Sequence, residues 1–114
     1  MQSKTAELTR LDQNDYSISG PVDFSTVPEL VLRAKDFFKS YGKSADNTED
    51  TVVTITTDMS KTTECNSAGL ALLLEMYKLA RLNNIKCRFI NLPAPLMTIA
   101  KAYGVEREIR AICR

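Results

Sequence analysis

The sequence predicts an α/β sandwich, and three observations support this fold class. Residues 51–57 are seven β-branched residues in succession, which is typical of a central strand. An apolar helical pattern follows over residues 68–83, and residues 85–90 alternate as a second strand. Strands that alternate with helices usually form parallel pairs joined by helical crossovers. We therefore expect a mixed central sheet of four to five strands with three main helices.

The N-terminal part of the chain supplies two strands and the first helix. The strands are predicted at residues 6–11 and 16–19, around turn-forming residues 12–15, and Gly20-Pro21 is expected to end the second strand. The segment Thr26 to Glu29 has the pattern of a capping box with a proline in the first turn. The helix that it starts is expected to run to about Tyr41 and to stop at Gly42.

The remaining connections are predicted from their polarity and their proline and glycine residues. Residues 43–50 are polar and are expected to form an exposed loop, and residues 58–63 a loop that leads to the second helix. Pro93 and Pro95 open a third helix with Gly104 at its C-cap, and a short amphipathic tail follows over residues 105–113.

Length and charge limit the classes of function. At 114 residues the chain is expected to form one domain, residues 1–114. A net charge of +1 without a basic stripe argues against a nucleic-acid-binding protein. No apolar run reaches the roughly 18 to 20 residues that cross a bilayer, so we expect no direct membrane insertion. Residues 1–7 lack the apolar part of a signal peptide, which indicates a reduced, cytoplasmic location.

The residues that usually carry catalysis are few. The chain has no histidine, which removes the commonest general base and metal ligand. Cys65, Cys87 and Cys113 are far apart in the sequence, so they suggest neither a disulfide framework nor a zinc site. Cys65 precedes a helix start, and we interpret it as a small core residue rather than a reactive thiol. We expect no enzymatic activity, no metal site and no cofactor.

The stretch most informative about function is residues 64–74, where a short polar segment leads directly into the apolar helix. Ser67 or Asn66 can cap this helix by accepting a hydrogen bond from an amide of its first turn. The Ser67 hydroxyl also lies at the positive end of the helix, a favourable place for an anion. Gly69 lacks a side chain and would let another group approach the backbone closely. Asn66, Ser67, Ala68 and Gly69 are therefore candidate binding residues.

The same helix carries two apolar stripes. The first stripe has the spacing of one helical face and consists of Leu70, Leu73, Leu74, Tyr77 and Ala80. Leu72, Met76 and Leu79 form a second stripe, roughly on the other side. The second stripe is either covered by a neighbouring element of the chain or free to bind a partner. We include its three residues in the candidate partner interface.

Two segments resemble one known family, the STAS domains. Residues 66–74, after the β-branched strand and its Asp58-Met59-Ser60 exit, resemble the family's signature, and residues 91–105 resemble its closing strand-to-helix segment. The match follows nearly the whole chain in order and implies the STAS fold. Together with the residue chemistry, it indicates a non-catalytic binding module centred on the Ser67 helix start.

Two branches of the family compete. In Mla-type phospholipid transporters, a small STAS subunit uses a hydroxyl residue at this place to bind the cytoplasmic ATPase of an ABC complex. Residues 69–74 and 96–103 look more like that subunit. In anti-sigma factor antagonists, the serine at this place is phosphorylated by a partner that is both anti-sigma factor and kinase. Both branches usually carry an acidic residue where this chain has Asn66.

The resemblance therefore implies an ABC transporter ATPase as the partner, with an anti-sigma factor kinase as the alternative. It implies a cytoplasmic protein, either free or held at the inner membrane through its partner. Nucleotide binding at the helix start, which has been suggested for STAS proteins, stays open.

Overall fold

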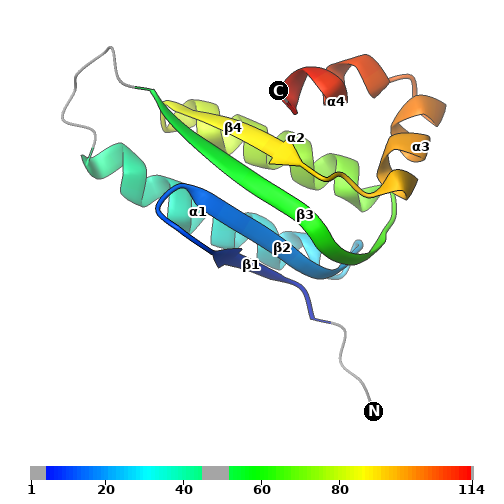
Figure 1. Cartoon of the computed structure of the whole chain (residues 1–114), viewed down its shortest axis with the longest axis horizontal. Helices are drawn as coiled ribbons and strands as arrows, with labels where there is room; N and C mark the ends of the chain where they lie inside the picture. The colour runs from blue at the N-terminus through cyan, green and yellow to red at the C-terminus, as the bar shows by residue number, and fades with distance from the viewer. Residues whose placement is uncertain (1–4, 45–51, 114) are drawn as a thin grey trace.

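The computed structural model describes residues 5–44 and 52–113, which form four strands and four helices (Figure 1). In chain order these are β1 (Glu7–Arg10), β2 (Asp15–Val22), α1 (Val27–Ser44), β3 (Val53–Cys65), α2 (Ala68–Leu82), β4 (Ile85–Ile90), α3 (Ala94–Ala102) and α4 (Glu106–Ile112). The predicted α/β class and the order of its elements are confirmed. The tail predicted over residues 105–113 folds as the fourth helix.

The four strands form one mixed sheet in the order β1-β2-β3-β4. β1 pairs with β2 antiparallel, whereas β2 with β3 and β3 with β4 pair in parallel. The expectation that the later strands are parallel is confirmed, and residues 53–57 of the β-branched segment belong to β3, an interior strand. Because β2, β3 and β4 run the same way, their carboxyl ends meet at one edge of the sheet.

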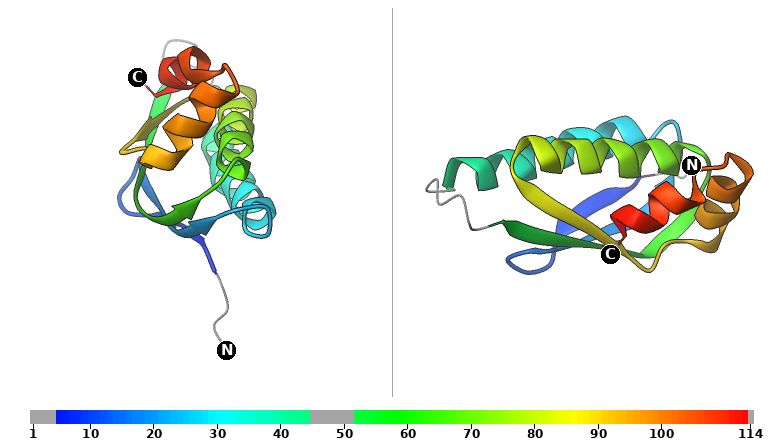
Figure 2. Two further views of the ribbon diagram at one scale, coloured as in Figure 1. Left: turned by 90° about the vertical axis from the view of Figure 1, so that its right-hand side faces the viewer. Right: turned by 90° about the horizontal axis from the view of Figure 1, so that it is seen from above.

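Two layers enclose the hydrophobic core. α1 and α2 lie side by side against one face of the sheet, and α3 and α4 lie toward the β4 edge (Figure 2). Alternate residues of each strand point into the core, as Ile55, Thr57 and Met59 do in β3. The largest fully buried side chains are Tyr16, Phe38, Phe89, Leu8, Ile18, Leu30, Ile55, Met59, Leu72, Leu73, Met76 and Leu96.

Strands β2 and β3 are longer than predicted. β3 continues through residues 58–63, which were expected to form a loop, and β2 continues past Gly20-Pro21 to Val22. The two strands stay paired across two irregularities in register, one of them at Gly20. Gly20 has φ +88°, and a Cβ there would lie 2.3 Å from the Thr5 carbonyl oxygen. A glycine therefore lets the strand bend where the sequence suggested that it ends.

Asp58 shows how the polar part of β3 is held. Its Oδ1 accepts hydrogen bonds from the Ser60 amide at 2.8 Å and from Asn91 Nδ2 at 3.0 Å. These two donors hold the pKa of the Asp58 carboxyl below its usual value, the Asn91 bond contributing most. The side chain thereby links β3 to the segment that follows β4.

The first helix also differs in its ends. Asp23 Oδ1 accepts a hydrogen bond from the Thr26 amide at 3.1 Å, the bond that the predicted capping box gave to the Glu29 side chain. Thr26 Oγ1 accepts a hydrogen bond from the Asp23 amide at 3.0 Å and donates to the Pro21 carbonyl. α1 continues through Gly42 to Ser44. Most of the loop predicted over residues 43–50 lies outside the described residues.

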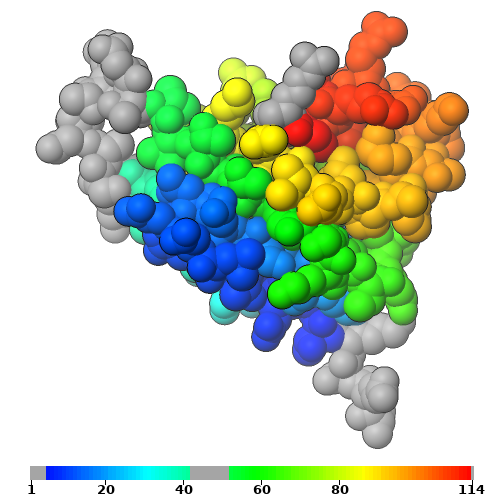
Figure 3. Space-filling model, in the orientation of Figure 1, coloured from blue at the N-terminus to red at the C-terminus, as the bar shows by residue number. Residues whose placement is uncertain are grey.

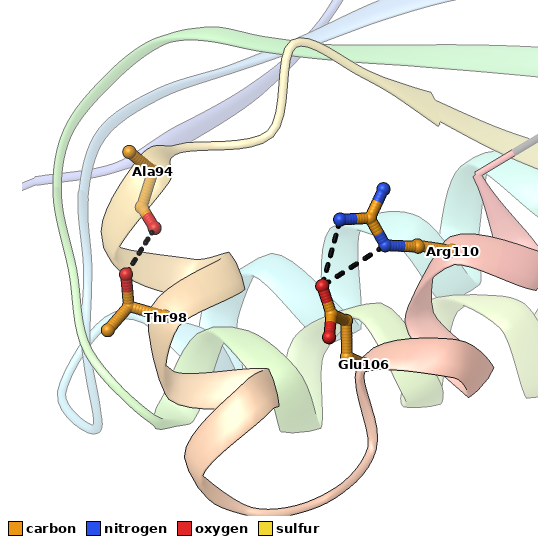
Figure 4. A network of polar contacts seen from close by, with 4 residues as sticks. All are labelled: Ala94, Thr98, Glu106 and Arg110. Atoms are coloured by element: carbon orange, nitrogen blue, oxygen red, sulfur yellow. Dashed lines mark hydrogen bonds and ion pairs between the residues drawn. The ribbon is translucent and has the colours of Figure 1, made fainter.

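The last two helices bury Leu96, Ala100 and Ile109 in the core, and each also has a local polar contact (Figure 4). In α3 the Thr98 hydroxyl donates to the Ala94 carbonyl at 3.2 Å, and in α4 the Arg110 guanidinium donates twice to Glu106, at 2.8 and 3.2 Å. The Arg110 bonds lower the pKa of the exposed Glu106 carboxyl. Within the described ranges, we find no helix with the length and apolar character needed to span a membrane.

Candidate functional site

The predicted site lies in the turn between β3 and α2, at the carboxyl edge of the parallel strands. The Asn66 amide donates a hydrogen bond to the Val22 carbonyl at 3.2 Å, which fixes this turn to the end of β2. The turn that follows β2 therefore lies next to the start of α2. Ser67 lies at the carboxyl end of β3, an interior strand.

Asn66 and Ser67 have different roles at the helix start. Asn66 Oδ1 accepts a hydrogen bond from the Ala68 amide at 2.8 Å, which is the geometry of an N-cap. Ser67 has helical dihedral angles, φ −63° and ψ −18°, and its side chain makes no capping hydrogen bond. Of the two capping residues that the sequence allowed, Asn66 is the one that caps. The Ser67 hydroxyl is half-buried and is left available for another contact.

The amides of the first helical turn are already used. The Ala68 amide donates to Asn66 Oδ1, the Gly69 amide to the Asn66 carbonyl at 2.9 Å, and the Leu70 amide to the Ser67 carbonyl at 3.1 Å. An anion bound at a helix start is normally held by such amides. The anion site suggested by the sequence is therefore not preformed by these three donors.

Ala68 and Gly69 contribute packing inside the protein. Ala68 is 1% exposed, and Gly69 is also buried. A Cβ added at Gly69 would lie 2.5 Å from the Cys65 Sγ and 3.1 Å from the Leu96 Cδ1. The group that approaches the Gly69 backbone is thus the chain itself, at the junction of β3, α2 and α3. These two positions are not surface contacts, contrary to the prediction.

The stripe predicted as a partner interface is mostly core. Leu72 and Met76 are completely buried, and Leu79 is partly buried against the same core. α2 contacts α1, β4 and α3, so its buried surface covers much more than one narrow face. Leu72 and Met76 therefore cannot bind a partner in this fold. The alternative that a neighbouring element covers the stripe is correct.

A different stripe of α2 reaches the surface, and it starts at Ser67. Ser67, Ala71, Leu74 and Lys78 are spaced i, i+4, i+7 and i+11, which places them on one side of the helix. Ala71 and Lys78 are exposed, and Leu74 is 47% exposed although it belongs to the first apolar stripe of the sequence pattern. Phe24, in the turn after β2, is 71% exposed.

We call Phe24, Asn66, Ser67, Ala71 and Leu74 together the Ser67 surface. It combines a neutral hydroxyl and an amide with three apolar side chains. Such a composition is typical of a protein–protein contact, in which aromatic and aliphatic anchors lie beside a few polar groups.

Phe24 was not identified as a surface residue from the sequence, although the turn-forming residues around it mark a turn before the helix. Asp23 Oδ1 accepts hydrogen bonds from the Ser25 amide at 2.9 Å and the Ser25 hydroxyl at 2.6 Å, and from the Thr26 amide. This turn holds the aromatic residue between capping residues and outside the helical pattern. The Phe24 side chain is 71% exposed and so is not packed against the helix that follows.

The cysteines show no sign of reactivity. Burial raises the pKa of the Cys65 thiol to about 11 and that of Cys87 to about 12, so both stay protonated near neutral pH. The interpretation of Cys65 as a small packing residue fits its contact with α2. Among the residues that the structure describes, no group of three or more Cys, Asp or Glu side chains could hold a metal ion.

Comparisons with known proteins agree with this architecture. The structure of the anti-sigma factor antagonist SpoIIAA in its unphosphorylated form is similar with a TM-score of 0.61 and 15% identity, over 94% of this chain and 92% of that one. The structure of SLC26A9 is similar with a TM-score of 0.55 and 16% identity, over 85% of this chain and 17% of that one. At such identities the likeness shows the fold alone.

No curated protein sequence matches the chain closely enough to count as a relative. The family model of the STAS domain matches residues 6–114, which is almost the whole sequence and includes every strand and helix described above. The chain therefore belongs to the STAS domain family.

Proposed function

We propose that this STAS domain is a non-catalytic module that binds a protein partner through the Ser67 surface. The observation that supports this most is the Ser67 hydroxyl, which is relieved of capping by Asn66 and lies in line with the exposed Ala71 and Leu74. Phe24 adds an exposed aromatic side chain in the turn after β2, which the Asn66–Val22 hydrogen bond places next to the start of α2. Buried apolar anchors provide most of the free energy of a contact, and a hydroxyl among them adds direction.

The partner we propose is the ATPase subunit of an Mla-type phospholipid ABC transporter. This rests on the resemblance of residues 69–74 and 96–103 to the small STAS subunit of that system. The neutral Asn66 and the uncharged Ser67 hydroxyl beside Leu74 also suit a contact that is partly apolar. The module would then act in the cytoplasm, at the inner membrane through its partner, as a single domain that assembles or regulates the transporter.

An anti-sigma factor antagonist is the second candidate, and one observation favours it. The Ser67 hydroxyl is half-buried, makes no capping bond and lies at the positive end of a helix, where a phosphate is favoured. Phosphorylation would add about −1.5 to −2 charges there. Because the three nearby amides already have acceptors, the phosphate would act mainly by repelling a partner from the apolar residues next to it.

Affinity purification of the chain from its native cells, followed by mass spectrometry, tests both candidates. We expect an ABC ATPase to co-purify and Ser67 to be unmodified. A Leu74→Asp variant should lose this protein, whereas Lys35→Gln, an exposed change on α1, should retain it. Recovery of an anti-sigma factor kinase with phosphorylated Ser67 would instead establish the antagonist role.

The absence of catalysis is a separate part of the proposal. We expect the purified chain to turn over no nucleotide, because its sequence lacks histidine and a phosphate-binding loop. Hydrolysis of ATP or GTP that disappears in a Ser67→Ala variant would contradict it.

A further inference from the structure

The charges of this chain are unevenly distributed, although its net charge is only +1. From Met76 to Val105 the sequence contains five basic residues, Lys78, Arg81, Lys86, Arg88 and Lys101, and no acidic residue. These thirty residues include the last half of α2 and all of β4. A net charge near zero therefore hides a basic region at one edge of the sheet.

Three of these cations gather at β4. Arg81 and Lys86 line the same hollow, which has a volume of about 350 Å³, and Arg88 follows Lys86 by two residues on the same side of the strand. All three are exposed. Figure 3 shows β3 and β4 side chains, in green and yellow, at the surface of the sheet. We call Arg81, Lys86 and Arg88 the β4 basic surface.

The β4 basic surface is not neutralised by the protein. None of its residues forms a salt bridge with a carboxylate in the described part of the chain, whereas the neighbouring Lys78 pairs with Glu75 at 3.6 Å. The Arg81 guanidinium lies over the Tyr77 ring, 6.0 Å from its centroid. Tyr77 and the 52% exposed Val52 line the hollow beside the cations.

The opposite edge of the sheet has the opposite character. Exposed Glu7, Asp12 and Asp15 lie on β1, in the turn after it and at the start of β2. Arg10 donates there to the Asp12 and Gln13 carbonyls at 3.2 and 2.9 Å and keeps its charge, so three carboxylates and one guanidinium leave residues 5–16 with a net charge of −2. A domain with one acidic and one basic edge is oriented by an anionic surface, with its basic edge toward that surface.

We propose that the β4 basic surface binds the anionic headgroups of a lipid bilayer. Exposed cations without a carboxylate partner suit a fluid layer of phosphate groups, and a tyrosine and a valine among them suit the boundary between headgroups and acyl chains. Three cations are too few for strong binding to nucleic acid. Lys86 lies near the amino end of β4, whereas Ser67 lies at the carboxyl end of the parallel strands, so both surfaces can be occupied together.

Vesicle co-sedimentation of the purified chain tests this proposal. The vesicles contain phosphatidylcholine alone, or phosphatidylcholine mixed equally with phosphatidylglycerol, at low ionic strength. We expect binding only to the anionic vesicles, and release in high salt. Each cation near such a surface contributes a factor of about five, so a variant with Arg81→Gln, Lys86→Gln and Arg88→Gln should bind roughly a hundredfold more weakly.

The matched control carries Arg33→Gln, Lys35→Gln and Lys39→Gln, exposed changes on α1 that remove the same charge. It should bind within a few-fold of the wild type, and both variants should keep the wild-type melting temperature. The proposal would be overturned if the two variants lost equal affinity for the anionic vesicles, or if the wild-type chain did not bind them. Equally tight binding to polyglutamate or to DNA at the same salt concentration would also overturn it, because the surface would then attract any polyanion.

Discussion

The division of roles between Asn66 and Ser67 gives the sharpest prediction of stability. An Asn66→Ala change removes the acceptor of the Ala68 amide, and Ala68 is only 1% exposed. Loss of an N-cap costs about 0.5 to 2 kcal/mol, and a buried amide without an acceptor costs about 1 to 3 kcal/mol. We therefore expect the free energy of unfolding to fall by about 1 to 2 kcal/mol.

For a chain of this length, that loss lowers the melting temperature by about 4 to 8 °C. Asn66→Asp should preserve stability because a carboxylate also caps a helix. Ser67→Ala should stay within about 0.5 kcal/mol of the wild type, since its hydroxyl makes no capping bond. Thermal and urea unfolding, followed by circular dichroism, measure all three. Equal destabilisation by Ser67→Ala and Asn66→Ala would refute the assignment of the cap to Asn66.

The remaining predictions concern the core. Met76→Glu should unfold the domain because burying a charge there costs several kcal/mol. Leu74→Glu should change the free energy of unfolding by about 0.5 kcal/mol or less. A lower melting temperature for Leu74→Glu than for Met76→Glu, followed by circular dichroism, would contradict the structure. Gly69→Ala should lower the free energy of unfolding by about 1 to 3 kcal/mol because its methyl group would meet Cys65, and by less when Cys65 is also replaced by alanine. If the two substitutions lower the free energy of unfolding additively in this double-mutant cycle, the contact with Cys65 is excluded. Burial raises the pKa of the Cys87 thiol from 9.0 to about 12, so its contribution to stability is complete below about pH 9 and is lost as the pH rises toward 12. In urea titrations over this pH range, the free energy of unfolding of Cys87→Ala should fall less steeply with pH than that of the wild type. The difference in slope should be about 1.4 kcal/mol per pH unit, and parallel dependence on pH in the two proteins would contradict this.

Much of the fold follows from periodicity, but long strands and buried helices are harder to predict. The β-branched segment, the alternating β4 and the limits of α2 are clear in the sequence because each has one dominant pattern. The extension of β3 through residues 58–63 is not, because its polar side chains are tolerated where pairing with β2 continues across the irregular register. Local composition cannot reveal a partner strand that is about forty residues away in the sequence.

The site was predicted in position but not in detail. The polar turn before the apolar helix correctly located the helix start and left two possible caps. Which one caps depends on backbone angles, and Ser67 is helical whereas Asn66 reaches back to the Ala68 amide. The error over Leu72 and Met76 arose because α2 is covered by α1, β4 and α3 together. When a helix is buried on several sides, its apolar residues do not form one face, so their spacing does not show which side is exposed to solvent.

The most direct test of the account is the affinity of the co-purified partner for the Ser67 surface, measured by titration calorimetry. Phe24→Ala and Ser67→Asp should each leave the fold intact and weaken binding by at least about 2 kcal/mol, roughly thirtyfold, as expected for anchors in a protein contact. Lys35→Gln should bind like the wild type. Wild-type affinity in both Phe24→Ala and Ser67→Asp would contradict the claim that the partner binds at the Ser67 surface.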